Sequence, residues 1–199
     1  PPAGPDGEAD PLIEEAIGLA DEFLHVHQAP IIFPLAAYGA LGTVGPRPQL
    51  LNMARGLVMQ IATHHRPDQV KIVALFAHAE AAQWEWLRWL PHVWTDDRRR
   101  RFLACYRDAA HDLLTGLYDL LMARREARET GQPTYLFLLA DPSLTEGEPI
   151  LPLLLEAGYT LRAYPLLFSE RPESLPQGLR ATAEVGPIIS RLVLSDRPE

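Results

Sequence analysis

One stretch decides the fold of this chain: Gly42-Thr43-Val44-Gly45-Pro46-Arg47-Pro48-Gln49. It follows an extended segment and opens a run, residues 49–64, in which apolar side chains recur at helical spacing. Anions bind well where a glycine-rich turn leads from a strand into a helix, because backbone N–H groups point outward there. The stretch therefore lies where a phosphate-binding loop is expected in an ATPase-like α/β domain.

The stretch departs from a working phosphate loop at its most important positions. Such a loop reads G-x-x-x-x-G-K-[ST], where the lysine neutralises phosphate charge and the hydroxyl holds Mg²⁺. Gly42 and Gly45 fit positions one and four of the Gly-x-x-Gly-x-Gly-Lys-Ser version. Glycine, lysine and serine are then replaced by Arg47, Pro48 and Gln49. Because proline has no N–H to donate, a cradle hydrogen bond is lost together with the lysine charge.

No other lysine offers itself as a substitute. Lys71 is the only one in the chain, and it begins another predicted strand. The residues left to contact a phosphate are Gly42, Thr43, Gly45 and Arg47. Two glycines and two prolines on their own usually indicate an ordinary turn, so this alternative stays open beside the phosphate loop.

A second motif follows at Tyr135-Leu136-Phe137-Leu138-Leu139-Ala140-Asp141-Pro142. An apolar strand that ends in a carboxylate resembles a Walker B strand, in which Asp141 would bind Mg²⁺ or its water. The next residue is normally a glutamate that polarises the attacking water, and here it is Pro142. The alternative is that Asp141 and Pro142 only begin a turn. Both interpretations predict no catalysis.

Apolar runs alternate with helical patterns along the chain. This alternation predicts right-handed crossovers and a RecA-like, P-loop-NTPase-like α/β three-layer sandwich with a mostly parallel central sheet. We expect residues 1–10 to form a disordered linker, and residues 11–199 to form a single domain cut from a longer chain. The expected strands are 71–76, 135–139, 161–168, 182–185 and an edge strand at 188–194, with short extended pieces at 24–26 and 31–34. The expected helices are 11–23, 49–64, 98–129 with a break near Gly116, and 150–156.

The composition excludes several classes of protein. With 47% hydrophobic and 22% charged residues, the 199-residue chain has an ordinary globular composition. It has no apolar run long enough for a membrane helix, and its net charge of −8 argues against a nucleic-acid partner. Cys105 is the single cysteine, so no internal disulfide forms, and we expect it to be buried in a helix beside Arg101. The basic block 98–101 is predicted to be a solvated helix start.

Histidines and tryptophans are further candidate site residues. His25 with His27, and His64 with His65, lack further ligands nearby, so we expect no metal site. Of the four tryptophans, we expect two to pack in the core and at least one to be an exposed contact to a neighbouring domain. The four are Trp84, Trp86, Trp89 and Trp94.

The order of these segments resembles the FtsK/SpoIIIE/HerA class of motor ATPases from about residue 38 onward. The matching turn is Leu90-Pro91-His92-Val93 followed by Thr95-Asp96, and the matching end of a later strand is Phe168-Ser169-Glu170-Arg171-Pro172. The resemblance implies that Glu170 stands where that class has a glutamine that reads the γ-phosphate. A carboxylate there would repel phosphate.

More narrowly, segments 51–57, 61–72 and 84–92 resemble the first cytoplasmic ATPase-like domain of the EssC/EccC proteins of type VII secretion. The resemblance implies a non-catalytic scaffold, without a cofactor, that couples a membrane stalk to active ATPase domains. It implies a cytoplasmic domain of a membrane-anchored protein that does not itself insert into the membrane. Its partners would be other domains of the same chain, other membrane components of the secretion system, and further copies in a hexamer-like assembly.

Two alternatives stay open at this point. The domain could bind ATP and Mg²⁺ weakly and regulate without hydrolysis, or it could be a divergent FtsK/HerA-type motor.

If the tryptophan-rich segment is an exposed contact, Trp84→Ala or Trp86→Ala should weaken association with the rest of the parent protein. A pull-down with correctly folded variants measures this association. Unchanged capture of the parent protein would contradict the expectation.

Overall fold

The computed structural model describes residues 11–23, 32–128 and 133–195. The chain divides into two compact units, residues 1–33 and 34–199. In the first unit, α1 (Pro11–Phe23) is the predicted helix, and it exposes Leu12, Ile17 and Leu19. Among the described residues, the second unit holds all the strands and the remaining helices. The assignment of residues 11–199 to one domain stays a prediction.

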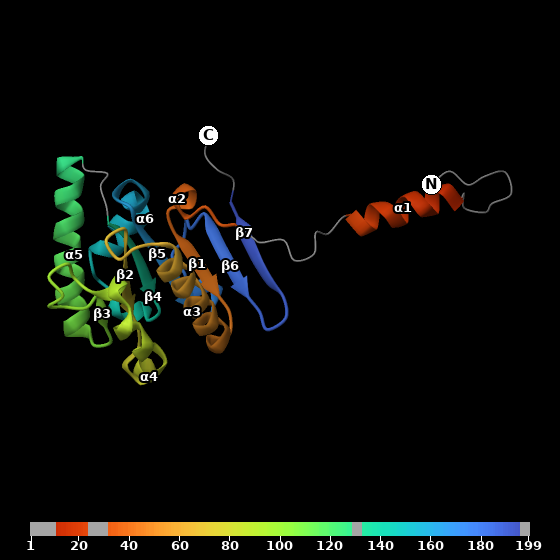
Figure 1. Ribbon diagram of the computed structural model, residues 1–199. Helices are drawn as coiled ribbons and strands as arrows, with labels where there is room; N and C mark the ends of the chain where they lie inside the picture. Colours follow the sequence, from red (N-terminus) through yellow and green to blue (C-terminus); the bar gives the residue numbers. More distant parts are fainter. Residues whose placement is uncertain (1–10, 24–31, 129–132, 196–199) are drawn as a thin grey trace. The chain divides into compact units, whose positions relative to one another are not determined.

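A seven-stranded sheet in the order β3-β2-β4-β5-β1-β6-β7 forms the centre of the second unit (Figure 1). All neighbouring strands are parallel except β6 and β7, which pair antiparallel. The fold class predicted from the sequence is therefore confirmed as a mostly parallel α/β sheet. The strands are β1 (Leu41–Val44), β2 (Val70–Leu75), β3 (Leu103–Ala104), β4 (Thr134–Leu139), β5 (Ala163–Ser169), β6 (Ala181–Val185) and β7 (Ser190–Leu194).

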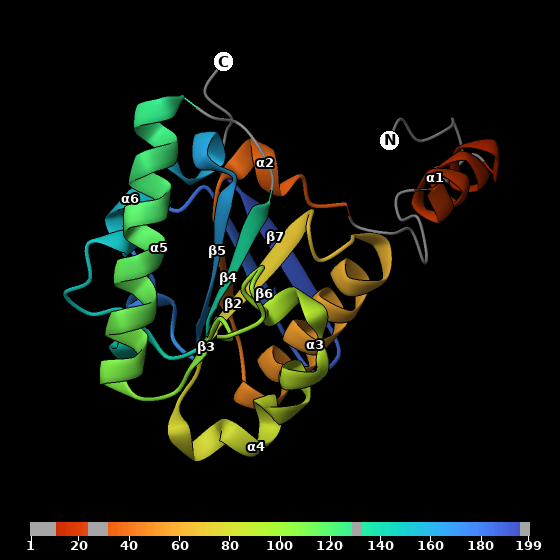
Figure 2. The ribbon, with the colours of Figure 1, turned by 60° about the vertical axis from the view of Figure 1, so that its left-hand side comes forward.

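Helices cover both faces of the sheet, as the uninterrupted apolar runs of β2, β4 and β5 require. One face packs against α5 (Arg107–Ala127) and α6 (Ile150–Leu161), where Val73 and Phe137 join the main core cluster. Successive side chains of a strand point to opposite faces, so Ile72 and Leu138 lie on the other face. That face carries α3 (Arg47–His64), which buries Leu50 (Figure 2).

Short helices connect the longer elements. Before β1 lies α2 (Leu35–Tyr38), directly after the extended piece expected at 31–34, and the piece expected at 24–26 lies outside the described residues. Between β2 and β3 the tryptophan-rich segment forms a series of short helical turns. These turns are η1 (His78–Glu80), α4 (Ala81–Trp84), η2 (Glu85–Trp89) and η3 (Pro91–Val93). The remaining turns, η4 (Pro142–Leu144) and η5 (Pro172–Ser174), follow β4 and β5.

The basic block 98–101 is solvated, as predicted, but it does not begin a helix. Thr95 N–H donates to the Arg100 carbonyl at 3.0 Å, and Asp97 accepts bonds from Thr95 Oγ1 and the Arg99 N–H. Arg98 has a left-handed backbone with φ of 54°, which a helix does not allow. These side-chain bonds close a tight turn, after which β3 forms and α5 begins only at Arg107.

Two further expectations for this region differ from the structure. The long helix α5 runs through Gly116 without a break. Cys105 lies between β3 and α5 rather than in a helix, and it is half-buried, with Sγ 3.8 Å from His78 Nδ1. The expected pair of His25 and His27 lies outside the described residues, and the described part of the chain holds no cluster of metal-ligating side chains.

The four tryptophans divide between core and surface. Trp84 is 2% exposed and stacks on Phe76 with ring centroids 5.5 Å apart, so its proposed role as a partner contact is wrong. Trp86 and Trp94 are half-buried. Trp89 is 79% exposed and has the Arg88 guanidinium 5.5 Å from its ring. A substitution at Trp89 therefore tests a surface contact, whereas one at Trp84 tests the core.

A histidine–carboxylate pair joins α5 to the segment that precedes α6. His111 Nδ1 lies 3.0 Å from a carboxylate oxygen of Glu148, whose side chain is 8% exposed. The hydrogen bond and the negative charge of Glu148 raise the pKa of His111 above its ordinary value of 6.5. The pair therefore favours the folded state when His111 is protonated.

This pair predicts a pH dependence of stability. Because the folded pKa of His111 is raised, its stabilisation is fully present below about pH 6.5 and is lost as the pH rises through the folded pKa. We expect the free energy of unfolding to fall across this range in urea titrations at successive pH values. His111→Gln should flatten that part of the profile, and a variant that keeps the wild-type slope would contradict the assignment.

Candidate functional site at the carboxyl edge of the sheet

The connection from β1 to α3 is very short. Only Gly45 and Pro46 separate the strand from the helix, whose first residue is Arg47. The Gly45 N–H donates to the Ser169 carbonyl at 3.2 Å, and a Cβ on Gly45 would come within 2.2 Å of the Val185 carbonyl oxygen. Gly45 is thus needed for close packing between the ends of β5 and β6. Pro48, at the position of the loop lysine, lies in the first turn of α3.

The first part of the expected loop is a strand. Gly42 and Thr43 lie buried inside β1, so the turn predicted to begin at Gly42 begins at Gly45 instead. A Cβ on Gly42 would come within 2.8 Å of methyl groups of Leu175 and Leu179. The Thr43 hydroxyl donates to the Leu167 carbonyl at 2.8 Å. Both residues serve the packing of the sheet, and a phosphate contact from either stays a prediction.

Arg47 lies at the carboxyl edge of the sheet, that is, the side at which the parallel strands end. There it contacts η1 and the residue that follows β4. Its guanidinium forms a two-pronged ion pair with Glu80 of η1, in which Nε donates to Oε1 at 2.6 Å and Nη2 pairs with Oε2. Nη2 also donates to the Ala140 carbonyl, just after β4, at 2.9 Å. Hydrogen bonding to Glu80 raises the pKa of Arg47, and hydrogen bonding to Arg47 lowers the pKa of Glu80. Both groups are therefore held in their charged forms.

Two more carboxylates lie near this pair. The charges of Glu170, after β5, and Asp141, after β4, also contribute to the raised pKa of Arg47. Asp141 is already engaged, since one carboxylate oxygen accepts bonds from the Ser143 N–H at 3.0 Å and from the Ser143 hydroxyl at 2.7 Å. It thereby caps η4. The edge thus gathers one cation and three carboxylates, a charge distribution that repels a polyphosphate.

Lys71 lies far along β2 from this edge. It is the second residue of the strand, and its ammonium donates to the Trp94 carbonyl at 2.9 Å and pairs with Asp96 at 2.8 Å. The structure therefore brings together Gly45, Arg47 and Asp141 of the predicted site but leaves the only lysine elsewhere. Sequence reasoning did not find Glu80, because its pairing with a residue 33 positions away depends on the strand order.

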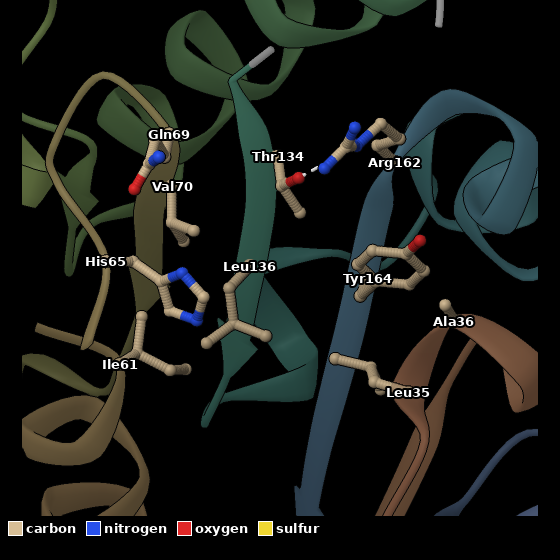
Figure 3. Close-up of a pocket in the computed structure, with 10 residues that line it drawn as sticks. All are labelled: Leu35, Ala36, Ile61, His65, Gln69, Val70, Thr134, Leu136, Arg162 and Tyr164. Atoms are coloured by element: carbon tan, nitrogen blue, oxygen red, sulfur yellow. Dashed lines mark hydrogen bonds between the residues drawn. The ribbon is translucent and has the colours of Figure 1, made fainter. Parts of the chain in front are cut away.

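A separate hollow lies at the opposite edge, where the strands begin (Figure 3). It measures about 700 Å³, and Leu136 of β4 lies at its floor between Ile61 of α3 and Tyr164 of β5. Arg162 Nε donates to Thr134 Oγ1 at 3.0 Å on its rim. Its lining is mainly apolar and includes none of the predicted site residues.

The short strand-to-helix turn between β1 and α3, together with the parallel sheet, defines a domain with the P-loop NTPase fold. Solved structures of this kind include two of Thermomonospora curvata EccC. One contains ATPases 2 and 3 in complex with a signal sequence peptide, with a TM-score of 0.61, 18% identity, and 79% of this chain and 33% of that chain covered. The other is the cytoplasmic domain of the type VII secretion ATPase EccC, with a TM-score of 0.61, 11% identity, and 86% and 25% covered.

The homologues of the chain are ESX secretion proteins of the EccC/EssC kind. It is 29% identical over 181 residues to the ESX secretion system protein EccC of Geobacillus thermodenitrificans, and 24% identical over 176 residues to YukB of Bacillus subtilis. These matches cover 89% and 86% of this chain but only 12% of either relative. No protein-family model matches the sequence. None of the described helices is both long and apolar enough to cross a membrane.

The Arg47–Glu80 pair should stabilise the fold measurably, because both partners are largely shielded and the geometry is two-pronged. A double-mutant cycle with Arg47→Ala and Glu80→Ala should give a coupling energy of about 1–2 kcal/mol in urea denaturation. The Arg66–Asp68 pair is similarly two-pronged but exposed, so its cycle is the matched control and should show much weaker coupling. Equal coupling in the two cycles would contradict the buried role of Arg47.

Proposed function

We propose that this chain is a non-catalytic ATPase-like domain of a type VII secretion protein. The observation that carries the proposal is the Arg47–Glu80 pair at the carboxyl edge. A nucleotide at this edge needs a positively charged, open cradle for its phosphates. Here the charge of Arg47 is neutralised by Glu80. The connection between β1 and α3 consists of Gly45 and Pro46 alone, which is too short to wrap around phosphates.

The chemistry that hydrolysis requires is also missing around Asp141. A water-activating carboxylate normally follows the strand, and Pro142 offers none. The carboxylate of Asp141 is used to cap η4, and Glu170 adds negative charge where a phosphate would lie. These features support the proposal that the domain has an ATPase-like fold but does not hydrolyse ATP.

In this proposal the domain acts through protein contacts, as a coupling module between a membrane stalk and active ATPase domains. The homology to EccC proteins supports this role, because the Thermomonospora protein carries numbered ATPase domains in one chain. The exposed Trp89, flanked by Arg88, is a suitable anchor for a neighbouring domain. Self-association of such domains within a ring-like assembly belongs to the same proposal.

A second candidate function is weak nucleotide sensing without hydrolysis. It rests on one observation: the Arg47 side chain is 22% exposed and lies at the start of α3, so an anion can reach it. If this function holds, Mg-ATP should raise the melting temperature saturably, and Arg47→Ala should abolish the shift. A melting temperature that does not respond to millimolar Mg-ATP rejects this candidate.

The absence of catalysis predicts a measurable outcome. The isolated 34–199 unit should release phosphate from Mg-ATP no faster than a protein-free blank, and Asp141→Asn should behave like the wild type. The reason is that Pro142 stands where the water-activating carboxylate is expected, and Pro48 stands where the phosphate-binding lysine is expected. Turnover above the blank that disappears in Asp141→Asn would contradict the proposal.

A further inference from the structure

A groove runs along the β3 edge of the sheet, away from the Arg47 site. It lies between the turn 95–101 and α5, and it measures about 670 Å³. Its floor is apolar and is formed by Phe102, Leu103, Leu113, Leu117, Leu120 and Tyr135. Leu120 is 36% exposed, so part of this floor faces solvent.

The rim of the groove is basic although the chain as a whole has a net charge of −8. Arg99, Arg100 and Arg101 line it together with Lys71, against the carboxylates of Asp96 and Asp112. The arginine side chains are exposed, and their backbone is fixed by the hydrogen bonds between Thr95 and Arg100. Arg99 also pairs with Asp97 of the same turn at 3.8 Å, so four cationic side chains face three carboxylates. The groove thus offers a small local excess of positive charge beside apolar surface.

Lys71 supplies a charge that is almost completely buried. The residue is 5% exposed, and its ammonium lies against Trp94 O and the carboxylate of Asp96. The Asp96 side chain itself is 84% exposed and belongs to the turn. Asp96 therefore occupies the position beside Lys71 from which a ligand carboxylate would have to displace it.

Trp94 extends the surface beyond the groove. It lines the groove and also a smaller hollow of about 320 Å³ formed with Trp89, Pro91 and Arg98. The Arg101 guanidinium lies 4.0 Å from the centre of the Trp94 ring. Tryptophan and arginine are the residues that most often dominate binding energy at protein interfaces.

Gly116 keeps the groove open. It lines the groove from the middle of α5, and a Cβ built on it meets no atom within 4 Å. A helix-interior glycine costs about 1 kcal/mol relative to alanine, and no packing contact here requires it. A larger side chain at this position would fill the groove without a clash in the core.

We propose that this groove binds an acidic polypeptide segment of a partner protein, one that carries apolar side chains between its carboxylates. The carboxylates would pair with the arginine rim and with Lys71 in place of Asp96. The apolar side chains would cover the leucines of α5. The charge complementarity and the aliphatic floor both favour such a segment over a nucleic acid, whose bases bind mainly to exposed aromatic rings.

Fluorescence anisotropy with the full 199-residue chain tests the proposal. The probe is a short fluorescein-labelled peptide that has leucines at helical spacing and glutamates between them, and a glutamine-for-glutamate version is its control. Saturable binding of the glutamate peptide is expected, and Gly116→Leu should weaken it about tenfold or more without lowering the melting temperature. Arg99→Glu with Arg100→Glu should weaken it similarly, whereas Arg125→Glu, near the end of α5 and outside the groove, should not.

Asp96→Asn should strengthen peptide binding, whereas the preceding groove variants should weaken it. Removing the internal carboxylate frees Lys71 for the ligand, so the affinity for the glutamate peptide should rise. Equal binding of the glutamine peptide, wild-type affinity in Gly116→Leu, or no gain in Asp96→Asn would overturn the proposal. A concentration-dependent dimer that Gly116→Leu dissolves would assign the groove to a second copy of the chain and also overturn it.

Discussion

The carboxyl edge of the sheet depends on the Arg47 guanidinium, which lies between the Glu80 carboxylate and the Ala140 carbonyl. This interaction ties the first turn of α3 to the turn after β2 and to the end of β4. In an active ATPase of this fold, phosphate and metal lie at the same edge and are held by lysine, hydroxyl and carboxylate groups. Here the protein places a cation and an anion of its own at this edge, and the two form an internal pair.

The other features of the edge agree with this constraint. The short β1–α3 connection places Arg47 directly at the start of the helix, and Gly45 allows that connection to pass close to β6. The Asp141 carboxylate caps η4. In the proposed non-catalytic domain, function would rest on surfaces such as those at the β3 edge and around Trp89, which are built from arginine, tryptophan and leucine.

The sheet could be predicted from the sequence because β2, β4 and β5 are buried on both faces and therefore read as apolar runs. The short strand β3 was hidden, since Leu103 and Ala104 fit a helical pattern equally well. The turn before β3 depends on side-chain hydrogen bonds of Thr95 and Asp97, which compete with helix formation. The arginines that follow are compatible with a helix, so the sequence did not reveal the turn. At the candidate site, the sequence shows that Pro48 and Pro142 stand where a phosphate loop has lysine and a Walker B strand has glutamate. It could not show that Glu80 is the partner of Arg47, because only the strand order brings the two together.

The claim that the internal pair replaces the nucleotide is tested most directly by calorimetric titration of the 34–199 unit with Mg-ATP and with a non-hydrolysable analogue. The account predicts no saturable heat for either nucleotide at millimolar concentration. Saturable binding that competes with the Arg47–Glu80 pair, and so becomes stronger in Glu80→Gln, would contradict it and would make nucleotide sensing the function of this edge.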